Sequence, residues 1–128
     1  MNLPGGIDAY FQLINDTLAN SPVIKSQDIF AEKRTLTEGY LRANVLFINS
    51  SQLHFRELIT TEPVIQRISY TYHYQREDGI MLFRYDDAPH FPTLPNAPHQ
   101  KHRGEEDVIA SEPPDLKSVL KEIEALIG

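Results

Sequence analysis

The chain contains no cysteine and no long run of apolar residues. Without cysteine it can form neither disulfide bonds nor thiolate metal sites. No segment approaches the ~18 consecutive apolar residues that a membrane-spanning helix requires. The first residues also lack the basic stretch followed by an apolar stretch that marks a secretory signal. We therefore expect a cytoplasmic protein with no membrane partner.

Bulk positive charge is absent as well. The formal net charge is −6, and five of the six surplus negative charges lie in residues 105–128. Residues 1–104 are nearly balanced, so this part of the chain can hold a phosphate locally but cannot bind nucleic acid through overall charge. With 128 residues, 41% apolar and 23% charged, the composition is that of an ordinary globular protein, and we expect a single domain over residues 1–128.

Two stretches repeat apolar residues at spacings of three and four, the pattern of an amphipathic helix. The first covers residues 7–18 and ends before Pro22, which cannot continue a helix. The second covers residues 116–127, with Asp115 as its expected N-cap. Both helices are expected to pack on an apolar surface.

Alternating apolar and polar residues predict two half-buried strands, at residues 41–47 and 53–59, and a weaker pattern indicates a first strand at residues 23–34. We expect the two stronger strands to form a hairpin with a three-residue loop at residues 49–51. The expected pairs are Phe47 with Leu53, and Ala43 with Glu57.

Glu57 is predicted to lie on the apolar face of this hairpin. Burial of an unpaired carboxylate costs several kcal/mol and raises its pKa, which is how a general acid or base is prepared. The alternative is a structural role, either at a solvated strand end or in an ion pair with Arg42 or Arg67.

Asp78-Gly79 separates two β-rich runs, residues 65–77 and 80–86, and predicts a two-residue type I′ turn. Counting outward from that turn pairs Tyr74 with Phe83, His73 with Arg84, and Tyr72 with Tyr85. One face of this hairpin is then aromatic and the other mostly polar. An aromatic sheet face can stack RNA bases, but packing against a helix is the more common use, and we favour it here.

Residues 87–114 show no secondary-structure periodicity and exceed the ~12–15 residues of an ordinary connecting loop, which favours a functional loop. Prolines at positions 89, 92, 95 and 98 recur at the three-residue period of polyproline II. The predicted fold is therefore α+β: an N-terminal helix, a twisted antiparallel sheet of about five strands, a long Pro- and His-rich loop and a C-terminal helix.

The predicted pairing of His73 with Arg84 is the sharpest candidate for chemistry. Directly opposed residues share one face of a sheet. A guanidinium can grip phosphate oxygens, while an imidazole moves protons near pH 7. Arg84 should also lower the pKa of His73 and so favour a base. The alternatives are a solvent-facing cross-strand pair and a surface ion pair between Arg84 and Asp86.

The expected loop is rich in groups that bind metals or anions. Asp86 and Asp87 together with one histidine could form an oxygen-rich metal site, although paired aspartates at a strand end usually cap turns. Lys101, His102 and Arg103 could bind phosphate, or form a solvated basic turn. His90 and His99 cannot share one ion if the prolines between them are extended.

The order of four motifs resembles the TumE family of bacterial toxins over nearly the whole chain. The motifs are His54-Phe55-Arg56-Glu57, Tyr70-Thr71-Tyr72-His73-Tyr74, Phe83-Arg84-Tyr85-Asp86-Asp87-Ala88-Pro89-His90 and Pro98-His99-Gln100-Lys101-His102. The combined string is specific, whereas no single motif is. The resemblance implies the toxin of a two-gene module whose partner is a helix-turn-helix antitoxin.

The resemblance also marks positions that are expected to matter, without giving their individual roles. They are Glu57, Tyr72, His73, Arg84, Tyr85, Asp86, Pro89, His90, His99, Lys101 and His102. Phe91 and Gln100 stand where the family often has further histidines, which weakens a metal site and leaves proton transfer open. No cofactor is expected.

Joining the resemblance to the residue chemistry gives a leading hypothesis of a metal-independent ribonuclease. Glu57 or His73 would deprotonate the 2′-hydroxyl, Arg84 would hold the phosphate, and His99 or His102 would protonate the leaving 5′-oxygen. The expected substrate-binding residues are Tyr72, Tyr85, Asp86, His90 and Lys101. One rival is a non-catalytic module that binds a protein through the Pro-rich loop and acidic C-terminal helix. The other is a metal-assisted hydrolase.

Overall fold

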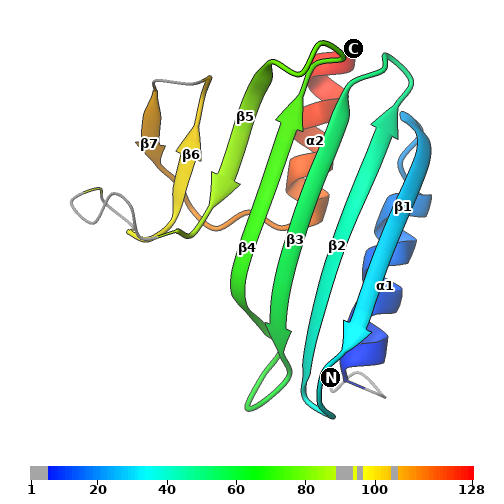
Figure 1. The fold of residues 1–128 in the computed structure, drawn as a ribbon, viewed down its shortest axis with the longest axis vertical. Helices are drawn as coiled ribbons and strands as arrows, with labels where there is room; N and C mark the ends of the chain where they lie inside the picture. The colour runs from blue at the N-terminus through cyan, green and yellow to red at the C-terminus, as the bar shows by residue number, and fades with distance from the viewer. Residues whose placement is uncertain (1–5, 89–93, 95–96, 105–106) are drawn as a thin grey trace.

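The computed structural model describes residues 6–88, 94, 97–104 and 107–128, and all statements about the structure refer to these. They form one seven-stranded antiparallel sheet with two helices behind it (Figure 1). The strands are β1 (Ile24–Lys33), β2 (Glu38–Phe47), β3 (Gln52–Thr60), β4 (Gln66–Gln75), β5 (Met81–Asp86), β6 (Gln100–His102) and β7 (Val108–Ala110). Each strand pairs with its neighbour in the sequence, so the sheet is a simple meander. The predicted α+β class is confirmed, with two more strands than expected.

Both helices form where the apolar spacing predicts them. Helix α1 (Ile7–Ala19) buries Ile7, Ile14 and Leu18 against the sheet. Helix α2 (Leu116–Ile127) begins with a capping box, in which the Asp115 side chain accepts a hydrogen bond from the backbone N–H of Ser118. None of the described helices has the length and apolar character needed to span a membrane.

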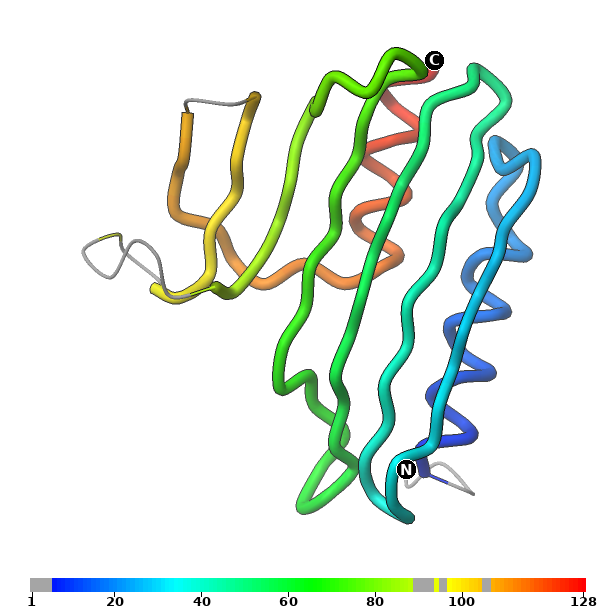
Figure 2. The backbone as a smooth tube through the Cα atoms, viewed as in Figure 1, coloured from blue at the N-terminus to red at the C-terminus, as the bar shows by residue number. Residues whose placement is uncertain are grey.

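The core lies between the sheet and the two helices, which cover the same face of the sheet (Figure 2). Gly39 on β2 allows α1 to approach closely, since a Cβ atom there would lie 2.6 Å from Ile7 and 2.8 Å from Phe11. The predicted aromatic face is part of this core, because Tyr70, Tyr72 and Tyr74 are all buried in it. Their use in packing, rather than in stacking bases, is confirmed.

The hairpin of β2 and β3 forms as predicted, but its register differs by two positions. The structure pairs Ala43 with Phe55 and Leu41 with Glu57. The loop is three residues long but lies at residues 48–50, one position earlier than expected, and Ser50 adopts a left-handed φ of 69°. Because the shift is an even number, every side chain keeps its face. Glu57 is therefore buried, with 1% of its surface exposed.

The turn between β4 and β5 has one residue more than predicted. The N–H of Arg76 bonds to the oxygen of Ile80 at 2.9 Å, which leaves residues 77–79 as a three-residue loop with Gly79 at a left-handed φ of 88°. Asp-Gly suits this loop as well as the type I′ turn, because both need a residue with positive φ. The prediction of a two-residue turn is wrong.

A β-bulge cancels the effect of this longer turn. Gln75 pairs with Met81 but Tyr74 pairs with Phe83, so Leu82 is an extra residue on β5. Beyond the bulge the predicted pairs are all present, including His73 with Arg84 and Tyr72 with Tyr85. Beyond the bulge the two offsets therefore leave the predicted faces of the hairpin intact, whereas Met81, predicted on the aromatic face, pairs with Gln75 of the polar face.

Residues 87–114 were expected to be irregular, and for β6 and β7 this is wrong. β6 extends the sheet by pairing Arg84 with His102, Tyr85 with Lys101, and Asp86 with Gln100, and β7 returns beside it. Three residues are too few to show an alternating pattern in the sequence. Most of the proline repeat lies outside the described residues, as does His90.

Candidate functional site

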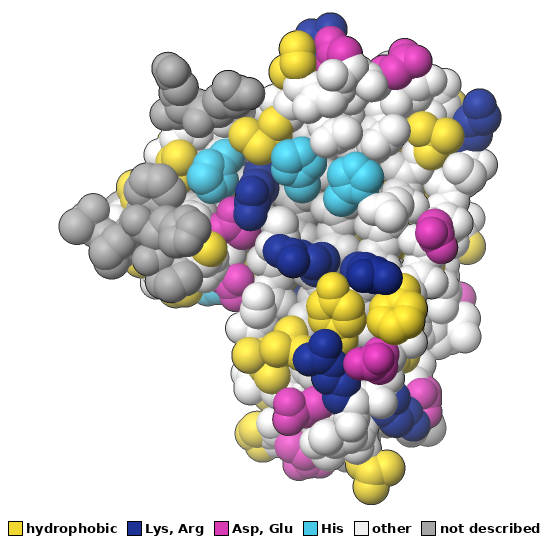
Figure 3. All heavy atoms as spheres, in the orientation of Figure 1, with side chains coloured by type: hydrophobic (Ala, Val, Ile, Leu, Met, Phe, Trp, Pro, Cys, Tyr) yellow, Lys and Arg dark blue, Asp and Glu magenta, His cyan; other side chains and the backbone are white. Residues whose placement is uncertain are grey.

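The sheet has two faces of different character. The face that carries the helices, here the helix face, is apolar and buried. The other, here the open face, has no helix over it in the described structure and points toward the viewer in Figure 3. Histidine side chains form a row across the strands on this open face, with Lys or Arg side chains beside them (Figure 3). The sequence-predicted site residues are divided between these two faces.

The open face carries one continuous polar row, here the histidine row. It takes one residue from each of five neighbouring strands: Asn44, His54, His73, Arg84 and His102. Each is the direct register partner of the next, and adjacent strands lie ~4.8 Å apart. Three imidazoles and a guanidinium therefore stand side by side on one surface.

His73 has its protonation state set by its neighbours. Its Nε2 lies 3.1 Å from Oε1 of Gln75, which can only accept, so Nε2 donates and Nδ1 is left as the basic nitrogen. Burial lowers the pKa of His73, and electrostatic interactions with Arg84 and His54 lower it further, against the opposing effect of the Gln75 hydrogen bond. The predicted direction is confirmed. A neutral imidazole beside a cation is suited to act as a general base.

Asp86 contacts two members of the site, Arg84 and His102, and also Gln100. It is 2% exposed, and its Oδ2 lies 3.1 Å from Nε of Arg84 and 3.4 Å from Nε2 of His102. Its Oδ1 accepts a 2.6 Å hydrogen bond from Nε2 of Gln100. The predicted alternative of an Arg84–Asp86 ion pair is thus present, but with a buried carboxylate. That carboxylate lies close to both Arg84 and His102, although Nε of Arg84 makes no hydrogen bond within the described structure.

Glu57 lies on the helix face. The hydroxyls of Tyr10 and Tyr72 both donate hydrogen bonds to its carboxylate. Arg67 Nη1 donates to the Tyr72 hydroxyl at 2.9 Å, so the arginine reaches Glu57 through a tyrosine rather than directly. Burial raises the pKa of Tyr10 and of Tyr72, and the negative charge of Glu57 raises both further. The structure therefore does not bring Glu57 together with His73.

Three other predicted site residues also contact the helix face. The ring of His99 stacks on Tyr70 with centroids 5.8 Å apart, and its Nδ1 lies 2.9 Å from the Tyr70 hydroxyl. Lys101 Nζ pairs with Glu122 Oε2 on α2 at 2.8 Å, and the Tyr85 hydroxyl donates to the same carboxylate at 2.6 Å. These contacts bind β5, β6 and α2 together.

Sequence reasoning missed His54, Arg42 and Arg56 as members of the site. All three lie on the open face, on strands whose alternation already placed them opposite the apolar set. With His73 and Arg84 they line a shallow hollow of about 290 Å³. Alternation could have placed these three residues on the open face, because they occupy the polar positions of two predicted strands.

The described residues offer no ready set of metal ligands. No group of three or more His, Asp or Glu side chains among them has metal-binding geometry. Asp86 and Asp87 turn to different partners, because Asp87 Oδ1 accepts a 3.2 Å hydrogen bond from the N–H of Tyr70. Within the described residues, Asp86 and Asp87 therefore do not point toward a common metal site.

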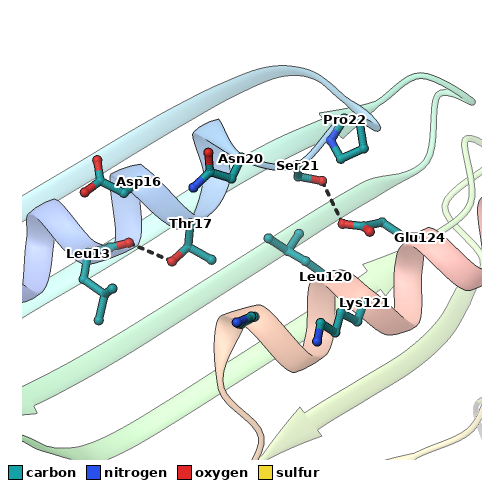
Figure 4. Close-up of a pocket in the computed structure, with 10 residues that line it drawn as sticks. Leu13, Asp16, Thr17, Asn20, Ser21, Pro22, Leu120, Lys121 and Glu124 are labelled. Carbon is teal, nitrogen blue, oxygen red and sulfur yellow. Dashed lines mark hydrogen bonds between the residues drawn. The ribbon is translucent and has the colours of Figure 1, made fainter.

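A larger hollow of about 390 Å³ lies between the two helices (Figure 4). Leu13 and Thr17 of α1 face Leu120 of α2 across it, and Ser21 Oγ donates to Glu124 Oε2 at 3.1 Å at one end. Among the described residues that line it there is no histidine and no arginine. It therefore lacks the acid–base groups of the open face.

Comparison with known families agrees with the motif order. The family model described as Toxin TumE matches residues 11–127, which is most of the chain and includes every described residue of the histidine row. No curated protein and no solved structure matches the chain at a significant level.

Proposed function

Because the chain belongs to the TumE toxin family, we propose that it is the toxin of a two-gene toxin–antitoxin module and that it acts by cleaving RNA on the open face. The family implies an antitoxin partner. We propose a helix-turn-helix protein for that role, and we expect it to neutralise the toxin by covering the open face. The observation that supports RNA cleavage is the direct pairing of His73 with Arg84, with His102 next in the same row.

The proposed reaction needs one base, one anion-binding group and one acid. His73 Nδ1 removes the proton of a 2′-hydroxyl, and the resulting oxygen attacks the adjacent phosphorus. Arg84 stabilises the negative charge that develops on the phosphate oxygens. His102 donates a proton to the 5′-oxygen as the P–O5′ bond breaks. The products are a 2′,3′-cyclic phosphate and a free 5′-hydroxyl.

The sequence left two candidates for the base, Glu57 and His73, and two for the acid, His99 and His102. The open face supports one of each. Glu57 and His99 make their contacts on the other face of the sheet, whereas His73 and His102 flank Arg84. The buried carboxylate of Asp86 lies near both Arg84 and His102 and orients them. We therefore assign the base to His73 and the acid to His102.

The test in cells is induced expression with and without the neighbouring gene. We expect the wild-type chain to arrest growth and the neighbouring gene to prevent this, while His73→Ala and Arg84→Ala should both permit growth. Arg76→Ala is the matched control, since Arg76 lies in the same hairpin at an exposed position by the turn. Arrest by all of these variants alike would contradict the proposed site.

The test of chemistry uses purified protein and single-stranded RNA in the presence of a chelator. We expect cleavage to persist and to leave 2′,3′-cyclic phosphate ends. Loss of Arg84 should slow it about 10²- to 10³-fold and loss of His73 about 10²- to 10⁴-fold. Complete inhibition by the chelator would favour a metal-assisted hydrolase. Growth arrest with intact RNA would favour a non-catalytic module that binds a protein.

A further inference from the structure

A second polar row runs beside the histidine row on the open face, one register step along the strands. It contains Phe30 of β1, Arg42 of β2, Arg56 of β3, Thr71 of β4 and the buried Asp86 of β5, each the direct partner of the next. Arg42 and Arg56 are both exposed and stand directly opposite each other. Like charges in this position destabilise a sheet. Within the described part of the chain, neither guanidinium forms an ion pair with a carboxylate.

Two unpaired arginines side by side are suited to an anion that spans them. Their place in the molecule favours the anion of the proposed reaction. Arg42 and Arg56 line the same hollow as His73 and Arg84, so the two rows share one continuous surface. An anion held by the arginines would therefore lie next to the proposed reaction centre.

The distance from Arg42 in this second row to Arg84 in the histidine row exceeds the size of a single phosphate. Arg42 and Arg84 lie on strands three positions apart, which corresponds to roughly 14 Å at the usual strand spacing. A ligand that touches both must carry several negative charges along an extended backbone. A single strand of nucleic acid has this form.

Phe30 supplies an apolar surface at the end of the row. Its side chain is 45% exposed, and the Arg42 guanidinium lies 4.9 Å from the ring centroid. An exposed aromatic ring beside arginines can stack an unpaired base, which a duplex would not offer. Phe30 thus adds a contact with bases to the contacts with phosphates.

We propose that Phe30, Arg42 and Arg56 form a binding subsite for single-stranded RNA, which holds the nucleotides adjoining the phosphate that is cleaved at Arg84. This inference rests on the proposed ribonuclease function, and it names the substrate as a single strand that crosses β1 to β5. Arg42 and Arg56 bind successive phosphates, and Phe30 stacks a base beyond them.

The test is binding of a fluorescent ten-nucleotide single-stranded RNA whose 2′-oxygens are methylated, so that binding is measured without cleavage. The double variant Arg42→Gln/Arg56→Gln should bind at least about tenfold more weakly. The slope of log affinity against log salt should also fall in magnitude by about 1.4, which is about 0.7 for each phosphate that the variant no longer neutralises. Phe30→Ala should weaken binding about tenfold. Circular dichroism checks that the variants are folded.

The matched control is Lys117→Gln/Lys121→Gln, which removes the same net charge from exposed positions on α2. It should leave the affinity and the salt slope as in the wild type. Equal losses in both double variants would show that total charge alone matters and would overturn the subsite.

The result also separates the subsite from the ribonuclease proposal. If the wild type cleaves RNA but Arg42→Gln/Arg56→Gln binds and cleaves as well as the wild type, the subsite is wrong and the ribonuclease stands. The same conclusion holds if those substitutions weaken only antitoxin binding, because the arginines would then serve a protein partner. If the wild type binds RNA through the arginines but cleaves none, the subsite stands and the ribonuclease proposal is wrong.

Discussion

At the scale of single residues, the proposed chemistry of the open face depends on keeping one imidazole neutral. Burial lowers the pKa of His73 below the ordinary histidine value of 6.5, and electrostatic interactions with Arg84 and His54 lower it further. A base with a lowered pKa stays unprotonated to lower pH. On the acid side of its pH profile, RNA cleavage should therefore decline only below the range in which an ordinary histidine gains its proton.

Substitution of Arg84 tests this electrostatic coupling directly. In Arg84→Gln the pKa of His73 should rise, because a positive charge that opposed protonation is gone. NMR titration of the His73 ring protons measures this shift even if activity is lost. Arg76→Gln, by the exposed turn, should leave the titration as in the wild type. An unshifted His73 in Arg84→Gln would mean that the two groups are not close in solution.

The Glu57 cluster makes a different prediction, because its hydrogen bonds hold the core. Tyr72→Phe removes one donor from a buried carboxylate and should lower the free energy of unfolding by about 1 to 3 kcal/mol. Denaturant titration measures this change. Tyr40→Phe is the control, since no hydrogen bond of its hydroxyl is found among the described residues, and its effect should stay within about 0.5 kcal/mol. Equal stability of Tyr72→Phe and the wild type would contradict a structural role.

The residues of the site were predictable to different degrees. The partner of His73 was predicted correctly although the turn was not, because the bulge at Leu82 offsets the extra loop residue, whereas the burial of Glu57 followed from alternation along one strand. The tyrosine that reaches Glu57 from α1 could not be predicted, because helical periodicity shows which face is apolar but not which strand lies beneath it. On β6, Lys101 and His102 point to opposite faces of the sheet. This could not be predicted, because a strand of three residues shows no alternating pattern.

At the scale of elements, α1 depends on the missing side chain at Gly39. Gly39→Ala should destabilise the protein by about 1 to 3 kcal/mol, since the new methyl group would overlap Ile7 and Phe11. Thermal or denaturant unfolding measures the loss. The double variant Ile7→Ala/Gly39→Ala should lose less than the sum of the two single variants, because the smaller residue removes most of the overlap. Simple additivity would show that close packing at this point is not the cause.

The elements themselves were largely predictable, and their registers less so. Both helices and the strands β2 to β5 carry clear sequence patterns, and β1 carries a weaker one, whereas β6 and β7 are too short to show any. The β4–β5 loop is one residue longer than predicted, and the β2–β3 loop lies one position earlier. Asp-Gly and Asn-Ser-Ser each suit more than one turn, so the sequence could not decide between them. Parity still held in both hairpins, because burying one face forbids a net slip of one residue.

At the scale of the whole molecule, the buried core and the proposed reaction site lie on opposite faces of one sheet. The buried tyrosines on the helix face predict a loss of stability at alkaline pH. Burial raises the pKa of Tyr70 to about 12, and it also raises the pKa values of Tyr72 and Tyr10. Unfolded tyrosine loses its proton near pH 10. The folded state therefore holds protons that the unfolded state has released.

The free energy of unfolding should be at its full value below pH 10 and should fall as the pH rises from about 10 to 12. Denaturant titrations at several pH values, followed by circular dichroism, measure this. Tyrosinate absorbance should show a group of tyrosines that ionise only when the chain unfolds. Ionisation of every tyrosine near pH 10 without loss of structure would contradict the burial of these hydroxyls.

The end of the β4–β5 hairpin has a consequence for changes of length. Since Leu82 occupies a bulge, its deletion would shorten the tip while the loop kept Gly79 at its left-handed position. The chain would then close as a regular hairpin, with Arg84 still opposite His73. The tip can therefore lose one residue. The number of residues between His73 and Arg84 then changes, but both side chains stay opposite each other on the open face.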